Sequence, residues 1–247
     1  MTDIAPTDPD GAADGEASAL PPWSKLPLRL FDLIVMVALA VGAVLVLRWI
    51  LHPREISSGL VVGFLFGQNV ALVGIVWLIA VVWRRASWRS LGLVTATRSW
   101  YRRIIPLALL LQFVVIVTNV LISLGLGQPF DNPQIALIMP DPGDWAAMVG
   151  ILVATAVLAP IAEELTLRAV LYGWLRRHVG PILAGLISAA AFAALHGSLV
   201  LLPGTFLVGL ALAWVYERSG SLIPCILLHG CFNAISTLLV FIVAANQ

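Results

Sequence analysis

Three charged side chains lie inside an apolar stretch that runs from residue 145 to residue 174. They are Glu163, Glu164 and Arg168. A charge at the centre of a bilayer costs at least about 2.5–3.5 kcal/mol, so such residues usually face a protein interior and serve a function. Glu164 and Arg168 are four residues apart, which places them on one helical face where they can pair, while Glu163 points elsewhere. Pro160 removes a backbone donor and predicts a kink that frees carbonyl oxygens to bind water or substrate.

Two later apolar stretches each carry a histidine with a partner four residues away. Phe192 precedes His196 in one stretch, and Asn233 follows His229 in the other. Side chains at this spacing share one face of a helix. Each histidine taken alone is more often a hydrogen-bonding group between helices than a catalyst. Their occurrence with the glutamates in one half of the chain favours a shared site.

The depth of these residues supports that interpretation. Glu163 lies seventeen residues before Gly180, and His196 lies sixteen residues after it. Gly180 and Pro181 predict a turn, and each helical residue rises about 1.5 Å. In an antiparallel hairpin the two side chains therefore reach a similar height, with His229 somewhat shallower. We expect the three clusters to line one cavity.

The chemistry available to such a cavity is hydrolysis. A carboxylate beside an imidazole, away from bulk water, can hold and deprotonate a water molecule. A second imidazole and an asparagine amide can donate hydrogen bonds to a developing oxyanion. Together these groups suit the hydrolysis of an amide bond. The Glu164–Arg168 pair would hold the helix and offset the second buried charge. Considered by itself, the pair could equally have a purely structural role.

The overall composition is that of a polytopic membrane protein. Of 247 residues, 60% are hydrophobic and 11% are charged, and the mean hydropathy is +1.00. We therefore expect an all-α transmembrane helical bundle. The net charge of +1 gives no indication of nucleic-acid binding. Residues 1–24 are polar, acidic and rich in Pro, Gly and Ala, and we predict a disordered cytoplasmic tail followed by a single bundle at 25–247.

Apolar windows of about 20 residues predict the membrane spans. They lie at residues 30–51, 59–83, 104–126, 145–174, 181–202, 205–216 and 222–244, which makes seven. An eighth helix within residues 129–139 is an alternative.

The basic residues orient this bundle. Six arginines crowd the loop between the second and third spans, namely Arg84, Arg85, Arg89, Arg98, Arg102 and Arg103. By the positive-inside rule the N-terminus is cytoplasmic, and we expect the cell (plasma) membrane as the location. We interpret this loop as a topology determinant, with contact to anionic lipid headgroups as the alternative. Asp32 lies near the same boundary, where we expect headgroups to solvate it.

The three motifs resemble those of the CPBP family of intramembrane proteases. This family includes the Ras-converting type of CAAX prenyl endopeptidase and bacterial relatives linked to bacteriocin processing and self-immunity. The resemblance covers about residues 145–243. Its motifs are Glu163-Glu164-Leu-Thr-Leu-Arg168, Phe192-Ala-Ala-Leu-His196 and His229-Gly-Cys-Phe-Asn233.

The resemblance implies an intramembrane endopeptidase with assigned roles. Glu163 and His196 would activate the water, and His229 and Asn233 would form the oxyanion hole. The supporting residues would be Glu164, Arg168 and Phe192. The expected partners are a membrane protein or lipidated peptide as substrate and the lipid bilayer, with no nucleic acid.

The sequence leaves alternatives open for the use of a metal ion and for the class of function. Glu163, His196 and His229 could instead form a three-ligand zinc site with an open position for water. The chain has no His-Glu-x-x-His pair, and the resemblance favours a metal-free mechanism, so no cofactor is expected. The other function classes are a proton-coupled transporter that uses the Glu and His side chains as a relay and a non-catalytic immunity or scaffold membrane protein.

Overall fold

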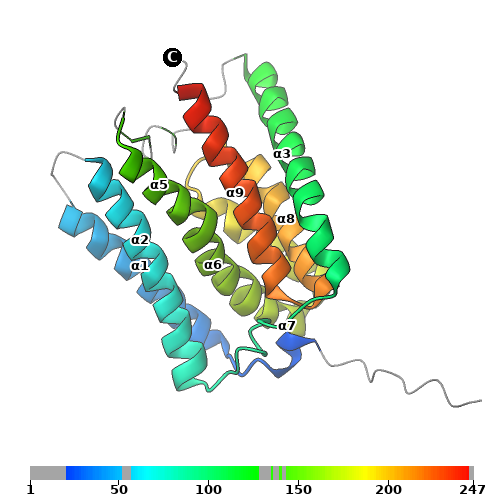
Figure 1. The fold of residues 1–247 in the computed structure, drawn as a ribbon. Coiled ribbons are helices and arrows are strands. Elements are labelled where there is room, and N and C mark those ends of the chain that lie inside the picture. The colour runs from blue at the N-terminus through cyan, green and yellow to red at the C-terminus, as the bar shows by residue number, and fades with distance from the viewer. Residues whose placement is uncertain (1–20, 52–56, 128–134, 136–138, 141–142, 245–247) are drawn as a thin grey trace, which may run out of the picture.

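Helices make up all the regular structure that the computed structural model describes. It describes residues 21–51, 57–127, 135, 139–140 and 143–244, and no strand occurs within them, so the all-α class is confirmed. Figure 1 shows the helices side by side as a bundle. In chain order they are η1 (Pro22–Lys25), α1 (Leu30–Leu51), α2 (Ser58–Val76), η2 (Trp77–Trp83), α3 (Arg98–Leu126), α5 (Trp145–Val153), η3 (Ala154–Leu158), α6 (Ala159–Glu164), η4 (Leu165–Tyr172), α7 (Gly173–Leu195), α8 (Leu202–Ser219) and α9 (Leu222–Ala244).

Five helical stretches are long and apolar enough to cross a membrane. They are Leu30–Leu47, Ser58–Trp83, Arg98–Leu126, Trp145–Leu195 and Leu222–Val243. The chain is thus an integral membrane protein, but the count of seven spans is not confirmed. Two predicted spans, 145–174 and 181–202, fall mostly within the 51-residue stretch Trp145–Leu195, and α8 is not among the five. The alternative eighth helix, 129–139, lies almost wholly outside the described residues.

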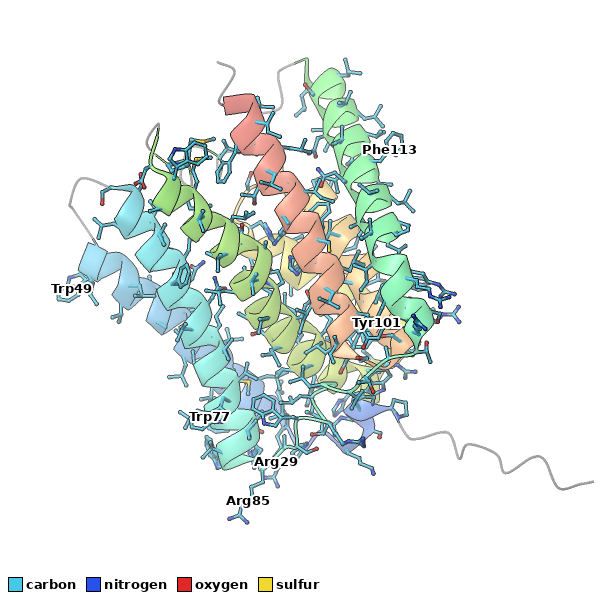
Figure 2. The ribbon with its side chains drawn as sticks, in the orientation of Figure 1. Arg29, Trp49, Trp77, Arg85, Tyr101 and Phe113 are labelled. Atoms are coloured by element: carbon cyan, nitrogen blue, oxygen red, sulfur yellow. The ribbon has the colours of Figure 1, made fainter. Side chains whose placement is uncertain are left out.

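The faces turned away from the bundle are apolar. Trp49, Trp77 and Phe113 project outward in Figure 2, and their exposed fractions are 78%, 49% and 64%. Side chains of this kind are in a favourable environment only next to hydrocarbon, since water would penalise so large an apolar surface. The outer surface therefore fits a lipid surrounding.

The longest stretch folds back on itself at Gly180. This residue has φ 81° and ψ 175°, which breaks the helix inside α7. Glycine adopts positive φ without a steric penalty, and Pro181 after it has no N–H to continue the helix. After the break the chain returns along η4, where the Ser188 hydroxyl donates a hydrogen bond of 3.0 Å to the Leu167 carbonyl. The predicted hairpin between the Glu163 and His196 segments is therefore present.

A continuous helix formed by α5, η3, α6 and η4 occupies the centre of the bundle. It lies between α2 on one side and α9 on the other, as Figure 1 shows. Two of its parts, η3 and η4, are wide π-helical turns, and they enclose the single α-helical stretch α6 that carries both site glutamates. Wide turns of this type occur frequently at functional sites.

The start of the described chain packs against the ends of the central helices. Residues 1–20 of the predicted tail lie outside the described residues, whereas Trp23 is buried in the turn η1. Its ring meets Tyr172 and Tyr216 edge-on, with centroid distances of 6.1 and 5.1 Å. The Arg177 guanidinium donates to the carbonyl of Leu26 at 2.6 Å. The segment before α1 is therefore part of the folded bundle.

Asp32 differs from its prediction. The side chain is completely buried, and the Arg84 guanidinium donates to its carboxylate at 2.7 and 2.9 Å. The backbone N–H of Arg29 donates to the same carboxylate at 2.7 Å. Solvation by headgroups was therefore the wrong expectation, because the carboxylate instead joins the start of α1 to the end of η2.

We predict that Gly209→Ala destabilises the bundle. A Cβ at Gly209 would lie 2.8 Å from the Cα of Ala189 on α7, so the two helices must separate. Overpacking of this kind costs about 1–3 kcal/mol, and it should lower the thermal unfolding midpoint of the purified protein in detergent. The control is Gly185→Ala in the same interface, where the nearest atom would be 3.9 Å away. Equal midpoints for the two variants would contradict the described packing.

Candidate active site

Glu164 and Arg168 form a buried ion pair, as their spacing predicts. Both side chains are completely buried, and Arg168 Nη1 lies 2.9 Å from Glu164 Oε1. The second guanidinium nitrogen, Nη2, donates to the carbonyl of Gly209 on α8 at 3.1 Å. The guanidinium also lies 4.9 Å from the centre of the Phe192 ring on α7. One arginine thus connects the central helix with α7 and α8.

His229 on α9 is held by the same carboxylate. Its Nδ1 lies 2.9 Å from Glu164 Oε1, and the ring is almost fully buried. A carboxylate paired with a guanidinium only accepts hydrogen bonds, so this contact requires the proton to be on Nδ1. The other nitrogen, Nε2, is turned toward Glu163 Oε2 at 3.8 Å. That separation allows both groups to contact one water molecule.

The two adjacent glutamates differ in accessibility. The Glu163 side chain is 26% exposed, whereas that of Glu164 is 0% exposed. This difference follows from their places on α6, because consecutive residues of a helix point about 100° apart. Glu164 is enclosed by its arginine and histidine partners, and Glu163 is the carboxylate that a substrate or water can reach.

His196 ends the returning half of α7. Its Nδ1 lies 2.9 Å from the carbonyl oxygen of Phe192, which requires the proton on Nδ1 because a carbonyl only accepts. The Phe192 ring has its centroid 4.9 Å from the His196 ring and 5.4 Å from the His229 ring. One buried phenyl ring thus contacts both imidazoles and the guanidinium. The prediction that Glu163 and His196 share a water molecule stays a prediction.

Asn233 is engaged with the wide turn before the glutamates. Its Nδ2 donates to the carbonyl of Thr155 at 2.9 Å. In this turn Ala159 bonds the carbonyl five residues earlier, that of Ala154. The matching donor for Thr155 would be residue 160, which is a proline and has no N–H. Asn233 replaces that missing donor, so a carbonyl expected to meet water or substrate is bonded by α9 instead.

An amide has two N–H groups, and one of them remains for another acceptor. Among the described residues, the second N–H of Asn233 has no partner. The oxyanion role that the resemblance implies is therefore compatible with this position. Close approach of α9 brings Asn233 here, because a Cβ at Gly230 would lie 2.6 Å from the carbonyl oxygen of Ala156.

The residues that sequence reasoning missed are mainly backbone groups. The acceptor for Arg168 is the carbonyl of Gly209, and the acceptor for Asn233 is the carbonyl of Thr155. A carbonyl leaves no side-chain signature in a sequence. Pro160 was the available signal for Thr155, since a proline predicts an unbonded carbonyl one turn earlier.

The alternative zinc site would use Glu163, His196 and His229 as ligands. Within the described ranges, no three histidine, cysteine, aspartate or glutamate side chains are grouped so that they could hold a metal ion. Glu163, His196 and His229, the ligands of that alternative, therefore do not form such a group.

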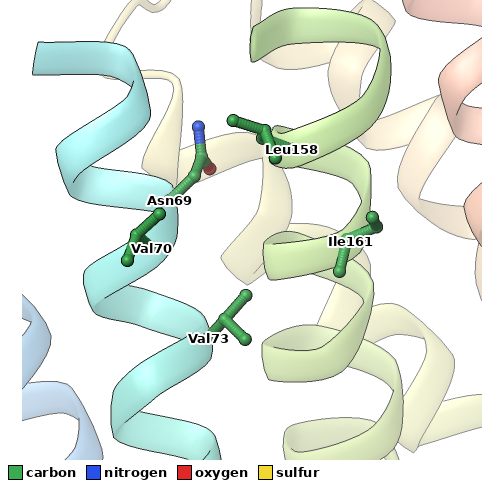
Figure 3. Close-up of a pocket in the computed structure, with 5 residues that line it drawn as sticks. All are labelled: Asn69, Val70, Val73, Leu158 and Ile161. Carbon is green, nitrogen blue, oxygen red and sulfur yellow. The ribbon is translucent and has the colours of Figure 1, made fainter. Parts of the chain in front are cut away.

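A separate cavity lies on another side of the central helix. It has a volume of about 230 Å³ and is lined by Asn69, Val70, Val73, Leu158 and Ile161, from α2 and the η3–α6 segment (Figure 3). Ile161 precedes Glu163 by two residues, so the two side chains point to nearly opposite sides of α6. This apolar cavity is thus distinct from the glutamate–histidine cluster.

Comparison with known families finds a match in the region that carries the candidate site. Residues 145–235 match the family described as type II CAAX prenyl endopeptidase Rce1-like. The match begins with the first residue of α5, ends within α9, and contains all seven candidate site residues. The region that carries the three motifs is therefore similar to this family. No curated protein and no solved structure matches the chain.

We predict that Arg168→Met destabilises the protein by about 3–5 kcal/mol, because it leaves the buried Glu164 carboxylate without its partner. Chemical or thermal unfolding in detergent measures this loss. In the double variant Glu164→Gln/Arg168→Met no charge is left unpaired, so much of the lost stability should return. Arg89→Met, the same change at an exposed position, is the control. A single variant as stable as the wild type would contradict the account of the pair.

Proposed function

We propose that this protein is an intramembrane endopeptidase that hydrolyses a peptide bond with water activated by Glu163 and histidine. The observation that carries the proposal is the accessible Glu163 carboxylate 3.8 Å from Nε2 of His229, an imidazole fixed by the buried Glu164. A base, an oriented imidazole and an amide donor on facing helices are the parts that amide hydrolysis needs. The family match to residues 145–235 supports the same reaction class.

In the proposed reaction Glu163 accepts a proton from water while the water oxygen attacks the carbonyl carbon of the substrate. His196 helps to hold this water. The second N–H of Asn233 and Nε2 of His229, when it is protonated, donate to the oxyanion. The carbon–nitrogen bond then breaks, and the proton held by Glu163 passes to the leaving nitrogen.

Glu164 and Arg168 act as positioning residues in this scheme. Glu164 fixes the proton of His229 on Nδ1, so that Nε2 faces the reaction, and Arg168 holds the Glu164 carboxylate in place through their ion pair. Phe192 packs against both imidazoles and limits their movement. Preorganised groups of this kind act without reorganising during the reaction.

We also propose the topology and the partners. The stretch Trp145–Leu195 has 51 residues, which is far longer than the 20 or so that one crossing needs, and it reverses at Gly180, so it crosses twice. With α8 as a further crossing the total is seven, in one bundle in the plasma membrane. The bundle includes the packed turn η1, and the N-terminus is on the cytoplasmic side. A membrane protein or a lipidated peptide is the substrate class.

Glu163→Gln should abolish cleavage while the fold is kept. Glutamine has nearly the same shape but cannot accept the proton, and loss of a general base slows such reactions by about 10²–10⁴-fold. Peptide mass spectrometry of membranes that express the wild type or the variant at equal levels should find cleavage products only for the wild type. The products also show whether the cut lies near a lipidated cysteine.

Glu217→Gln is the matched control for that experiment. Glu217 undergoes the same chemical change at a half-buried ion pair with Arg176, 2.8 Å long, on α8 and outside the site. Its peptide profile should equal that of the wild type. Identical profiles for the wild type and a folded Glu163→Gln would refute the proposed reaction.

We propose that the reaction needs no metal ion. Cleavage of a substrate peptide from the experiment above, by the purified protein, should persist after treatment with EDTA and with 1,10-phenanthroline. Loss of cleavage that added zinc restores would instead assign Glu163, His196 and His229 as ligands. The same protein without chelator is the reference.

A further inference from the structure

One end of the bundle carries exposed positive charge that no described carboxylate balances. The two described carboxylates at this end are already paired, Asp32 with Arg84 at 2.7 Å and Glu217 with Arg176 at 2.8 Å. Figure 2 places Arg29 and Arg85 together at this end. The exposed cations are Lys25, Arg29, Arg85, Arg89, Arg98, Arg102, Arg103, Arg177 and Arg218. This surface is therefore suited to an anionic partner.

Two of these arginines border a pair of tryptophans between α3 and α8. Trp100 and Trp214 meet edge-on with their centroids 5.6 Å apart, and the Arg103 guanidinium lies 5.1 Å from the centre of the Trp100 ring. Arg218 follows Trp214 by one helical turn and lies on the same face of α8. We name Trp100, Arg103, Trp214 and Arg218 the α3–α8 seam. Within this seam Trp214 is 48% exposed.

An apolar stripe runs away from the seam along α3. Arg103 is followed at helical spacing by Leu110, Val117 and Leu121, which share its face. These three side chains are 55%, 38% and 63% exposed. A charged end continued by an exposed apolar stripe matches a molecule with an anionic head and a hydrocarbon chain. A soluble anion or an acidic protein segment would have no use for the stripe.

We propose that the α3–α8 seam binds the headgroup of an anionic phospholipid, with its acyl chain along Leu110, Val117 and Leu121. Guanidinium groups bind phosphate oxygens through paired hydrogen bonds. Tryptophan rings are favoured at the level of the headgroups, and anionic lipids of the cytoplasmic leaflet attract basic segments at this depth. The charge thus has a binding role in addition to its role in orienting the chain.

Native mass spectrometry of the purified full chain tests this proposal. The protein in detergent is mixed with equal amounts of dioleoyl phosphatidylglycerol and dioleoyl phosphatidylcholine. The wild type should retain phosphatidylglycerol in preference to phosphatidylcholine. Arg103→Gln/Arg218→Gln should reduce that preference by about 10–30-fold, the loss expected for two arginines at a membrane surface.

Arg85→Gln/Arg89→Gln is the control, because it removes the same charge from the same end outside the seam and should keep most of the preference. Equal losses in the two double variants would overturn the proposal in favour of diffuse attraction. Equal binding of both lipids by the wild type would overturn it as well, as would displacement of the lipid by millimolar inorganic phosphate or by a soluble acidic peptide.

A second pair of variants keeps the test decisive if the glutamine variant does not fold. Arg103→Lys/Arg218→Lys retains the charge but loses the paired hydrogen bonds of the guanidinium. Its preference for phosphatidylglycerol should lie between that of the wild type and that of the glutamine variant. A preference equal to that of the wild type would show that charge alone acts there and would overturn the assignment of a headgroup site.

Discussion

A single buried ion pair is the interaction on which the candidate site depends. Glu164 Oε1 accepts from Arg168 Nη1 and from His229 Nδ1, at 2.9 Å each. Two charges removed from water are tolerated only when good geometry and further hydrogen bonds compensate their desolvation. Arg168 gains these from the carbonyl of Gly209 and from the Phe192 ring. Segments from α6, η4, α7, α8 and α9 therefore meet at one carboxylate and one guanidinium.

This arrangement divides the work between two neighbouring glutamates. Glu164 is wholly enclosed and determines which nitrogen of His229 carries the proton, whereas Glu163 keeps an exposed fraction of 26% on the next face of the same helix. A carboxylate that is enclosed by a guanidinium and an imidazole is out of reach of a substrate, whereas one that is partly exposed beside an oriented imidazole can be reached by water and substrate. The chemistry we propose for Glu163 rests on that contrast.

Departures from regular helix place the remaining groups. The wide turn η3 and Pro160 leave the carbonyl of Thr155 without a helical donor, and Asn233 supplies one from α9. Gly230 permits the close approach that this bond needs, since any side chain would meet the carbonyl of Ala156. At Gly180 the chain reverses, which returns Phe192 and His196 to the level of the glutamates. Irregular backbone is tolerated at these points because neighbouring helices complete its hydrogen bonds.

The sequence by itself determined the helical class and the membrane setting, through its apolar composition. It also determined the pairing of Glu164 with Arg168, through their four-residue spacing, and the reversal at Gly180, through the glycine and the proline that follows it. These are local properties, which hydropathy, helical period and the backbone preferences of glycine and proline specify. Only the tertiary structure decided that Asp32 is buried against Arg84, that His229 lies between two carboxylates, and that backbone carbonyls of Gly209 and Thr155 bind Arg168 and Asn233. Those contacts join residues far apart in the chain, and a carbonyl acceptor has no side-chain signature, so helix packing alone determines them.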